Sequence, residues 1–132
     1  MKIKMDFNHL KQLKKTILIT EDQDSNFQLL EFLLGIWGLT TIRARNGQEA
    51  IDICKKNKKI DLILMDIRLP DISGLEATRS IKAIQPGLPI IAHTAYAIEG
   101  TREDALKAGC EEFITKPVQK EHLFELLQQF LE

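Results

Sequence analysis

Short apolar runs alternate along the chain with longer stretches in which apolar residues recur every three or four positions. The runs are rich in β-branched and aliphatic residues and lack the strict polar alternation of a half-exposed strand. Such runs are typical of parallel strands that are buried on both faces. The predicted strands span residues 16–20, 40–44, 61–66, 89–93 and 112–115.

Each predicted strand is followed by a stretch with helical periodicity. In the first such stretch four apolar residues lie one helical turn apart, namely Phe27, Leu30, Leu34 and Trp37. The predicted helices span residues 24–37, 47–57, 74–84, 99–108 and 119–131. Repeated strand–helix units with short connections predict an α/β fold with a doubly wound, five-stranded parallel sheet. A closed barrel of eight such units would need about twice this length.

Residues 1–15 differ from the rest of the chain. They carry five lysines and one aspartate, and Ile3, Phe7 and Leu10 fall at helical spacing. Two interpretations stay open: the end of a helix that enters from an upstream domain, or a solvated leader. From residue 16 onward there are thirteen basic and eighteen acidic side chains, a balance of about −5. This charge disfavours nucleic acid as a direct partner.

Composition places the chain among folded globular proteins, with 44% hydrophobic and 28% charged residues. It has no apolar stretch near the ~18 residues of a membrane span, and no apolar signal segment at its start. We therefore expect a cytoplasmic protein without direct membrane contact, although tethering to a membrane-bound sensor stays open. Cys54 and Cys110 are expected to be buried hydrophobes, and three scattered histidines argue against zinc. His93 is expected to pack or to form hydrogen bonds rather than to react.

Polar side chains follow four of the five predicted strands. Glu21 and Asp22 follow the first, Asp66 ends the third, and Thr94 and Lys116 follow the fourth and fifth. Because the carboxyl ends of parallel strands meet at one sheet edge, we expect these groups to converge there. Three acids, a hydroxyl and an ammonium at one edge are suited to accepting a phosphoryl group.

The acids predict a divalent cation, because clustered carboxylates repel one another unless a cation is present. Their hard oxygen atoms favour Mg²⁺, with Mn²⁺ as an alternative. The competing interpretation is that Glu21 and Asp22 cap a helix, but Asp24 and Ser25 already supply caps. Asp66 is the candidate nucleophile, since aspartate carboxylates form phosphoryl intermediates. Separately, the Lys116–Pro117 bond is a candidate cis peptide.

The residues that carry this chemistry resemble the receiver domain of two-component response regulators over residues 16–132. The resemblance rests on Ile-Leu-Ile-Thr-Glu-Asp at 17–22, Leu-Ile-Leu-Met-Asp-Ile-Arg-Leu-Pro-Asp-Ile-Ser-Gly at 62–74, His-Thr-Ala at 93–95 and Lys-Pro at 116–117. It implies a flavodoxin-like fold with strand order 2-1-3-4-5, residues 1–15 being a linker or leader.

The resemblance also implies a function in a phosphorelay. A histidine kinase or histidine phosphotransfer domain would pass a phosphoryl group to Asp66, and Thr94 and Lys116 would bind that group. Mg²⁺ would be held by Glu21, Asp22, Asp66 and the backbone carbonyl of Arg68. Such a domain catalyses its own phosphorylation and dephosphorylation but is not otherwise an enzyme.

A conformational switch follows from the same resemblance. Thr94 would move toward the phosphoryl group and Phe113 would turn inward, which changes the face made by helix 99–108, strand 112–115 and the last helix. Dimerisation through this face stays open. Arg68 and Tyr96 flank the expected path of attacking water, and their bulk predicts slow self-dephosphorylation.

Several alternatives remain. The sequence is most like receivers joined to hybrid sensor histidine kinases, and a single-domain response regulator is the second context. A phosphatase with an aspartate nucleophile would want a second aspartate two residues on, where Arg68 stands. A flavin-binding module would want a phosphate-cradling loop where residues 21–24 are acidic. A pseudo-receiver would lack a key side chain, and none is missing.

Overall fold

The computed structural model describes residues 7–95 and 98–132. Its centre is a five-stranded sheet in the order β2-β1-β3-β4-β5, with every neighbouring pair parallel. The strands are β1 (Thr16–Thr20), β2 (Thr40–Ala44), β3 (Leu62–Asp66), β4 (Ile90–Thr94) and β5 (Glu112–Thr115). The predicted fold and strand order are therefore confirmed. The fourth strand lies one residue further along than predicted, so that Thr94 is its last residue.

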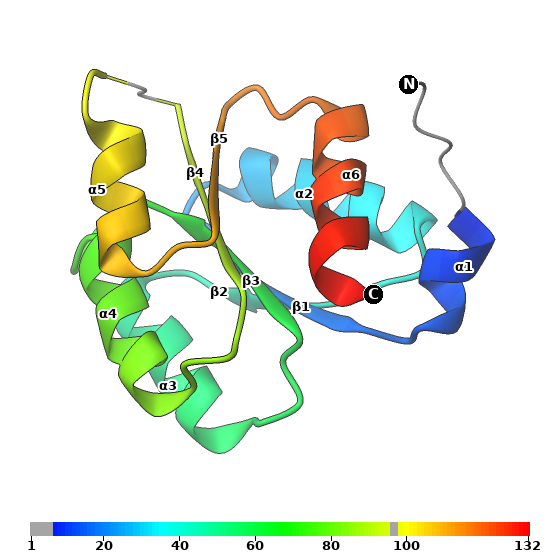
Figure 1. Ribbon diagram of the computed structural model, residues 1–132, viewed down its shortest axis with the longest axis horizontal. Coiled ribbons are helices and arrows are strands. Elements are labelled where there is room, and N and C mark those ends of the chain that lie inside the picture. The colour runs from blue at the N-terminus through cyan, green and yellow to red at the C-terminus, as the bar shows by residue number, and fades with distance from the viewer. Residues whose placement is uncertain (1–6, 96–97) are drawn as a thin grey trace.

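Helices cover both faces of the sheet. They are α1 (Phe7–Gln12), α2 (Asp24–Ile36), α3 (Gly47–Lys56), α4 (Gly74–Ile84), α5 (Thr101–Ala108) and α6 (Lys120–Leu131). Figure 1 shows α3, α4 and α5 on one side, and α1, α2 and α6 on the other. Two predicted caps form where expected, because the side chains of Asn46 and Ser73 accept hydrogen bonds from the backbone N–H groups of Glu49 and Glu76. The caps expected from Asp24 and Ser25 are wrong: α2 is preceded by Gln23, whose side chain forms no capping hydrogen bond, and the Asp24 carboxylate binds Arg43 instead. Helix α5 begins after Gly100, two residues later than predicted.

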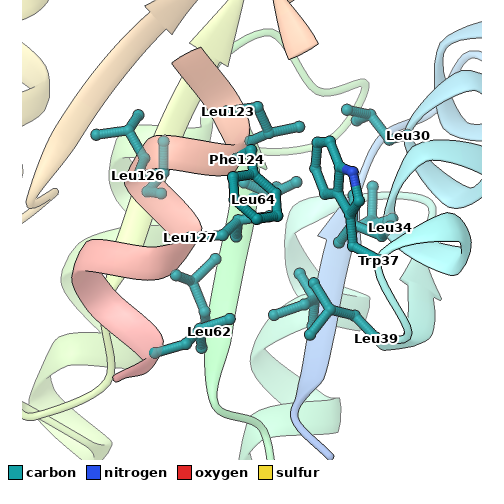
Figure 2. Packing of buried hydrophobic residues seen from close by; sticks show 14 of the residues in the cluster. Leu30, Leu34, Trp37, Leu39, Leu62, Leu64, Leu123, Phe124, Leu126 and Leu127 are labelled. Atoms are coloured by element: carbon teal, nitrogen blue, oxygen red, sulfur yellow. The ribbon is translucent and has the colours of Figure 1, made fainter. Parts of the chain in front are cut away.

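The core on the α2 and α6 side is built around two aromatic residues. The rings of Trp37 and Phe124 meet edge to face, with their centroids 5.1 Å apart (Figure 2). Leu64 of β3 lies in the same buried cluster. Trp37 is thus a core residue, as the helical stripe predicted.

Helix α1 adds to this core through Leu10, which is fully buried in the same cluster. Gly38 adopts φ +78°, and a Cβ there would lie 2.4 Å from Cγ of Lys11. The turn after α2 therefore needs glycine both for its backbone conformation and for contact with α1. The division of the chain at residue 15 stays a prediction.

The strand registers bring the carboxyl ends of four strands to one edge. Asp66 is paired with His93 across β3 and β4, and Thr94 with Thr115 across β4 and β5. Glu21 continues the same edge after β1, where its N–H donates to the carbonyl oxygen of Ala44 (3.0 Å). Within the described part of the chain, no helix is both long and apolar enough to cross a membrane.

Candidate functional site

A pocket of about 410 Å³ lies at the carboxyl edge of the sheet. Its lining includes Asp66 from β3, Thr94 from β4 and Lys116 after β5. The full lining is Asp22, Gln23, Asn26, Asp66, Arg68, Thr94, Ala95 and Lys116. Residues that are far apart in the sequence thus meet at the position that the strand-end argument predicted.

Lys116 joins two buried acids beside this pocket. Its Nζ donates to Oε1 of Glu21 at 2.5 Å and to Oδ2 of Asp66 at 3.2 Å. Both acids are buried, and Lys116 is nearly so. Because a buried carboxylate is costly without a charged or hydrogen-bonded partner, the ammonium stabilises both acids. One positive charge cannot balance two, so the edge keeps an excess of negative charge.

The backbone fixes the position of Asp66. Its Oδ1 accepts a hydrogen bond from the N–H of Arg68 at 3.0 Å, and a Cβ on Gly74 would lie 2.1 Å from its carbonyl oxygen. Only glycine lets the start of α4 approach the end of β3 this closely. The sequence predicted Ser73 as a cap but gave no role to Gly74.

An arginine from β2 holds the loop that carries the other acids. Arg43 donates to the carbonyl oxygens of Glu21 (3.1 and 3.2 Å) and Asp22 (3.3 Å). Its Nη1 donates to Oδ1 of Asp24 at 2.8 Å, and its guanidinium lies 4.5 Å from the ring centre of Phe27. The pKa of Asp24 is lowered by Arg43 and, secondarily, by Arg45.

The sequence analysis did not identify Arg43 as a site residue. The available signal was an arginine in an otherwise uncharged strand. Because its role depends on contacts with a loop some twenty residues earlier, spacing alone could not show it.

Thr94 and Lys116 lie side by side at the same edge. The N–H of Lys116 donates to the carbonyl oxygen of Thr94 at 2.8 Å, and Thr94 is buried. The Lys116–Pro117 bond is cis, as predicted. Each side chain therefore borders the pocket from a neighbouring strand.

His93 was left outside the site by the sequence, yet it lies directly beside the acids. It is fully buried, and a ring nitrogen, an oxygen of Glu21 and an oxygen of Asp66 all lie within 4.8 Å of one another. Burial, together with the charge of Lys116, lowers the pKa of His93 to about 3, while Glu21 acts in the opposite direction. Neither ring nitrogen has a hydrogen-bond partner among the described residues. The expectation that His93 packs or forms hydrogen bonds is met by packing alone.

The remaining predicted residues lie at the rim of this pocket, apart from it, or outside the described chain. Arg68 is exposed at the rim of the pocket. Phe113 is partly buried against the core on the α3, α4 and α5 side, and lines a separate pocket between β5 and α6. Tyr96 falls outside the described residues. Cys54 and Cys110 are buried and unpaired, as predicted.

Comparison with known proteins agrees with this arrangement. Residues 17–128 match the model of the response regulator receiver domain family. The polar-differentiation response regulator DivK of Brucella anthropi is 40% identical over 121 residues, which is 90% of this chain and 98% of that protein.

Solved structures are similar too. The magnesium-bound receiver domain of sensor histidine kinase PA1611 from Pseudomonas aeruginosa is 35% identical, with a TM-score of 0.83 over 89% of this chain and 98% of its own. The receiver domain of yeast Ssk1, crystallised with the histidine phosphotransfer protein Ypd1, is 31% identical, with a TM-score of 0.81 over 89% and 88%. With the family match across most of its length, the chain belongs to the response regulator receiver domains of two-component signal transduction.

Proposed function

We propose that this domain accepts a phosphoryl group on Asp66 from a phosphohistidine of its partner, in a reaction that depends on Mg²⁺. The observation that carries the proposal is the convergence of Glu21, Asp66 and Lys116 at the edge of one pocket. A buried acid pair bridged by a single ammonium supplies both a nucleophile and a charge partner for the incoming group.

The transfer would form a bond between phosphorus and an oxygen of Asp66 and break the bond from phosphorus to the partner's histidine nitrogen. The electron pair of the broken bond returns to the imidazole. Oδ1 of Asp66 is held by the N–H of Arg68, which fixes the carboxylate while it attacks. Lys116 and the hydroxyl of Thr94 would then bind the oxygens of the transferred group.

The donor set fits a magnesium ion. Asp22, Asp66 and Arg68 line the pocket, and carboxylate and carbonyl oxygens are the ligands that Mg²⁺ prefers. The bound ion would neutralise charge on the transferring oxygens. The related Pseudomonas receiver holds magnesium in its active site cleft, which supports the same assignment here. Glu21, buried against Lys116, would help to hold the ion from one side, and Mn²⁺ suits the same oxygens.

The partner would dock on α2. Leu29, Phe32 and Ile36 are 49%, 65% and 54% exposed, and they fall on one face of that helix. Leu29 also lines a small pocket with Lys116 and Pro117, so this apolar face is continuous with the site. A helical histidine phosphotransfer protein fits here, since an apolar helix face packs against another helix and the Ssk1 receiver was crystallised with such a partner.

Phosphorylation would be read out on the other side of the site. The added charge would draw Thr94 toward Lys116 and the phosphoryl group, and Phe113 would turn inward, changing the face of α5, β5 and α6. Dimerisation through this face stays a prediction.

Both a sensor kinase receiver and DivK are relatives, so a hybrid kinase and a single-domain regulator are both supported as contexts. Slow self-dephosphorylation, from the bulk of Arg68 and Tyr96, is also proposed.

The direct test is incubation with a small phosphodonor and Mg²⁺, followed by intact mass measurement. We expect one added phosphoryl group in the unmodified protein and in the control Asp52→Asn. Asp52 lies on α3, where its carboxylate accepts a hydrogen bond from the side chain of Gln48. We expect none in Asp66→Asn, and none when the metal is chelated. Equal labelling of Asp66→Asn would exclude the proposal.

A further inference from the structure

His93 is a buried residue that has no role in the proposed phosphoryl transfer. It precedes Thr94 on β4 and is paired with Asp66 in the register of the sheet. Ile91, two residues earlier, belongs to the core on the α2 and α6 side together with Leu64 of β3. Because alternate residues of a strand share a face, His93 and Asp66 extend this same side to the edge of the sheet.

The surroundings of His93 make it a candidate ligand. Its ring is fully buried, and neither nitrogen is hydrogen-bonded within the described residues. Buried polar groups without partners are rare in folded proteins and call for an explanation. Oxygens of Glu21 and Asp66 lie within 4.8 Å of a ring nitrogen and of each other.

We propose that Glu21, Asp66 and His93 form a site for a divalent transition-metal ion such as Zn²⁺, and that this ion blocks phosphoryl acceptance. The ligand set is one imidazole nitrogen and two carboxylate oxygens, all of them atoms that bind Zn²⁺, and a fourth position would be left for water. Mg²⁺ prefers oxygen ligands only, whereas an imidazole favours the later first-row metals. The three histidines are scattered in the sequence, but the sheet brings this one to the acids.

The geometry requires modest movement. In a tetrahedral zinc site neighbouring ligand atoms lie about 3.3 Å apart, so the three groups must close by up to about 1.5 Å. Lys116 must also leave, because its ammonium now bonds to both acids. A divalent ion would bring two positive charges to the two buried carboxylates, which now share the single charge of the ammonium. The pocket bordered by Asp66 and Lys116 provides the entry path.

The inhibitory part of the inference rests on the proposed function. A metal bound to Asp66 would occupy the carboxylate that must attack phosphorus, and it would displace Lys116 from its position. Metal binding itself does not depend on phosphorylation, so the two parts are measured separately.

The binding test uses Co²⁺ as a spectroscopic probe and Zn²⁺ as a competitor on the metal-free protein. We expect visible absorption of a low-coordinate, nitrogen-ligated Co²⁺ that Zn²⁺ abolishes. His93→Leu and His93→Gln should lose this absorption and bind Zn²⁺ at least about tenfold more weakly, since even loss of an indirect ligand contact can cost that much. The matched control, His9→Gln with His122→Gln, removes the other two histidines, both exposed, and should bind like the unmodified protein.

Two further measurements complete the test. Lys116→Met should bind Zn²⁺ more tightly than the unmodified protein, because no ammonium competes for the acids. His93→Leu should bind Mg²⁺ with the same calorimetric affinity as the unmodified protein, which would show that its fold is intact. With Mg²⁺ and phosphodonor present, Zn²⁺ should suppress labelling of the unmodified protein far more than of His93→Leu. Unchanged zinc affinity in both His93 variants would overturn the site. Zinc binding without suppression would overturn the inhibition, and absence of labelling before zinc is added would instead count against the proposed function.

Discussion

Two lysines pair with acids at opposite edges of the sheet: Lys82 forms a closed ion pair with one acid, and Lys116 is shared by two acids at the proposed phosphorylation site. Lys82 of α4 binds Oε1 of Glu111, while Oε2 of Glu111 accepts the N–H of Ile90 at 2.6 Å, at the amino end of β4. One ammonium meets one carboxylate whose oxygens are both satisfied. Lys116 instead serves two buried acids beside an open pocket. The closed pair ties the residue before β5 to α4 and to the start of β4, whereas the incomplete pairing at Lys116 leaves an excess negative charge beside the pocket.

Replacing each lysine by methionine tests this contrast most strongly. Lys116→Met should lower the rate of phosphorylation by about 100-fold or more, since one charge partner of the transferring oxygens is lost. Lys82→Met should leave that rate unchanged but lower the free energy of unfolding by about 1–2 kcal/mol, because the pair is partly exposed. Phosphodonor kinetics and urea unfolding measure the two effects. Equal loss of phosphorylation in both variants would remove the distinction.

Two glycines provide the next comparison. Gly74→Ala places a methyl group against the carbonyl of Asp66, so we expect a loss of about 1–3 kcal/mol in stability and at least about a tenfold slower phosphorylation. Gly35→Ala, in α2, meets no atom within 4 Å and should stabilise the protein by roughly 0.5–1 kcal/mol. Urea unfolding and phosphodonor labelling of the two variants show whether the close contact between Gly74 and the Asp66 carbonyl is needed for stability and phosphorylation. Normal labelling of a folded Gly74→Ala would count against it.

The features of the site that follow from strand topology could be predicted from the sequence, and those that depend on packing could not. The convergence of Asp66, Thr94 and Lys116 could be predicted because parallel strands always bring their carboxyl ends to one edge, whatever the side-chain details. The close contact at Gly74 could not, because it depends on how α4 packs against β3. Likewise, the bonds from Arg43 cross between loops that local periodicity does not relate.

His93 marks the same limit from another direction. Its burial could be predicted from its place in an apolar strand. Its lack of a hydrogen-bond partner among the described residues could not be predicted. It depends on the fact that the neighbouring Glu21 and Asp66 bond to Lys116 and not to the imidazole.

The pH dependence of folding should report the neutral imidazole. The pKa of His93 is about 3 in the folded state against 6.5 ordinarily, so the unfolded chain binds more protons between these values. The contribution of His93 to the free energy of unfolding is therefore complete above about pH 6.5. It falls as the pH decreases below that value, by up to about 1.4 kcal/mol per pH unit.

Unfolding of the metal-free protein between pH 7 and pH 5 measures this loss. His93→Leu should flatten the curve, and His122→Gln, which removes an exposed histidine, should follow the unmodified protein. Parallel curves for His93→Leu and the unmodified protein would show that the imidazole is not held neutral by burial.

The smallest expected effect concerns the loop after β1 that carries Glu21 and Asp22. Arg43→Lys keeps the charge but loses the forked bonds to the carbonyls of Glu21 and Asp22, so Mg²⁺ affinity should fall by up to about tenfold. Arg45→Lys is the matched control and should keep its Mg²⁺ affinity, because Arg45 pairs with the exposed carboxylate of Asp24. Calorimetric titration with Mg²⁺ compares them, and equal affinities would mean that the loop holds its shape without Arg43.

The central claim is that the edge with incomplete charge pairing presents one reactive carboxylate, that of Asp66. Borohydride reduction of the phosphorylated protein converts an aspartyl phosphate to homoserine, which peptide mass spectrometry locates. The account predicts homoserine at residue 66 alone, formed only when Mg²⁺ is present during labelling. Homoserine at Asp22, at Asp71 or spread over several aspartates would contradict it.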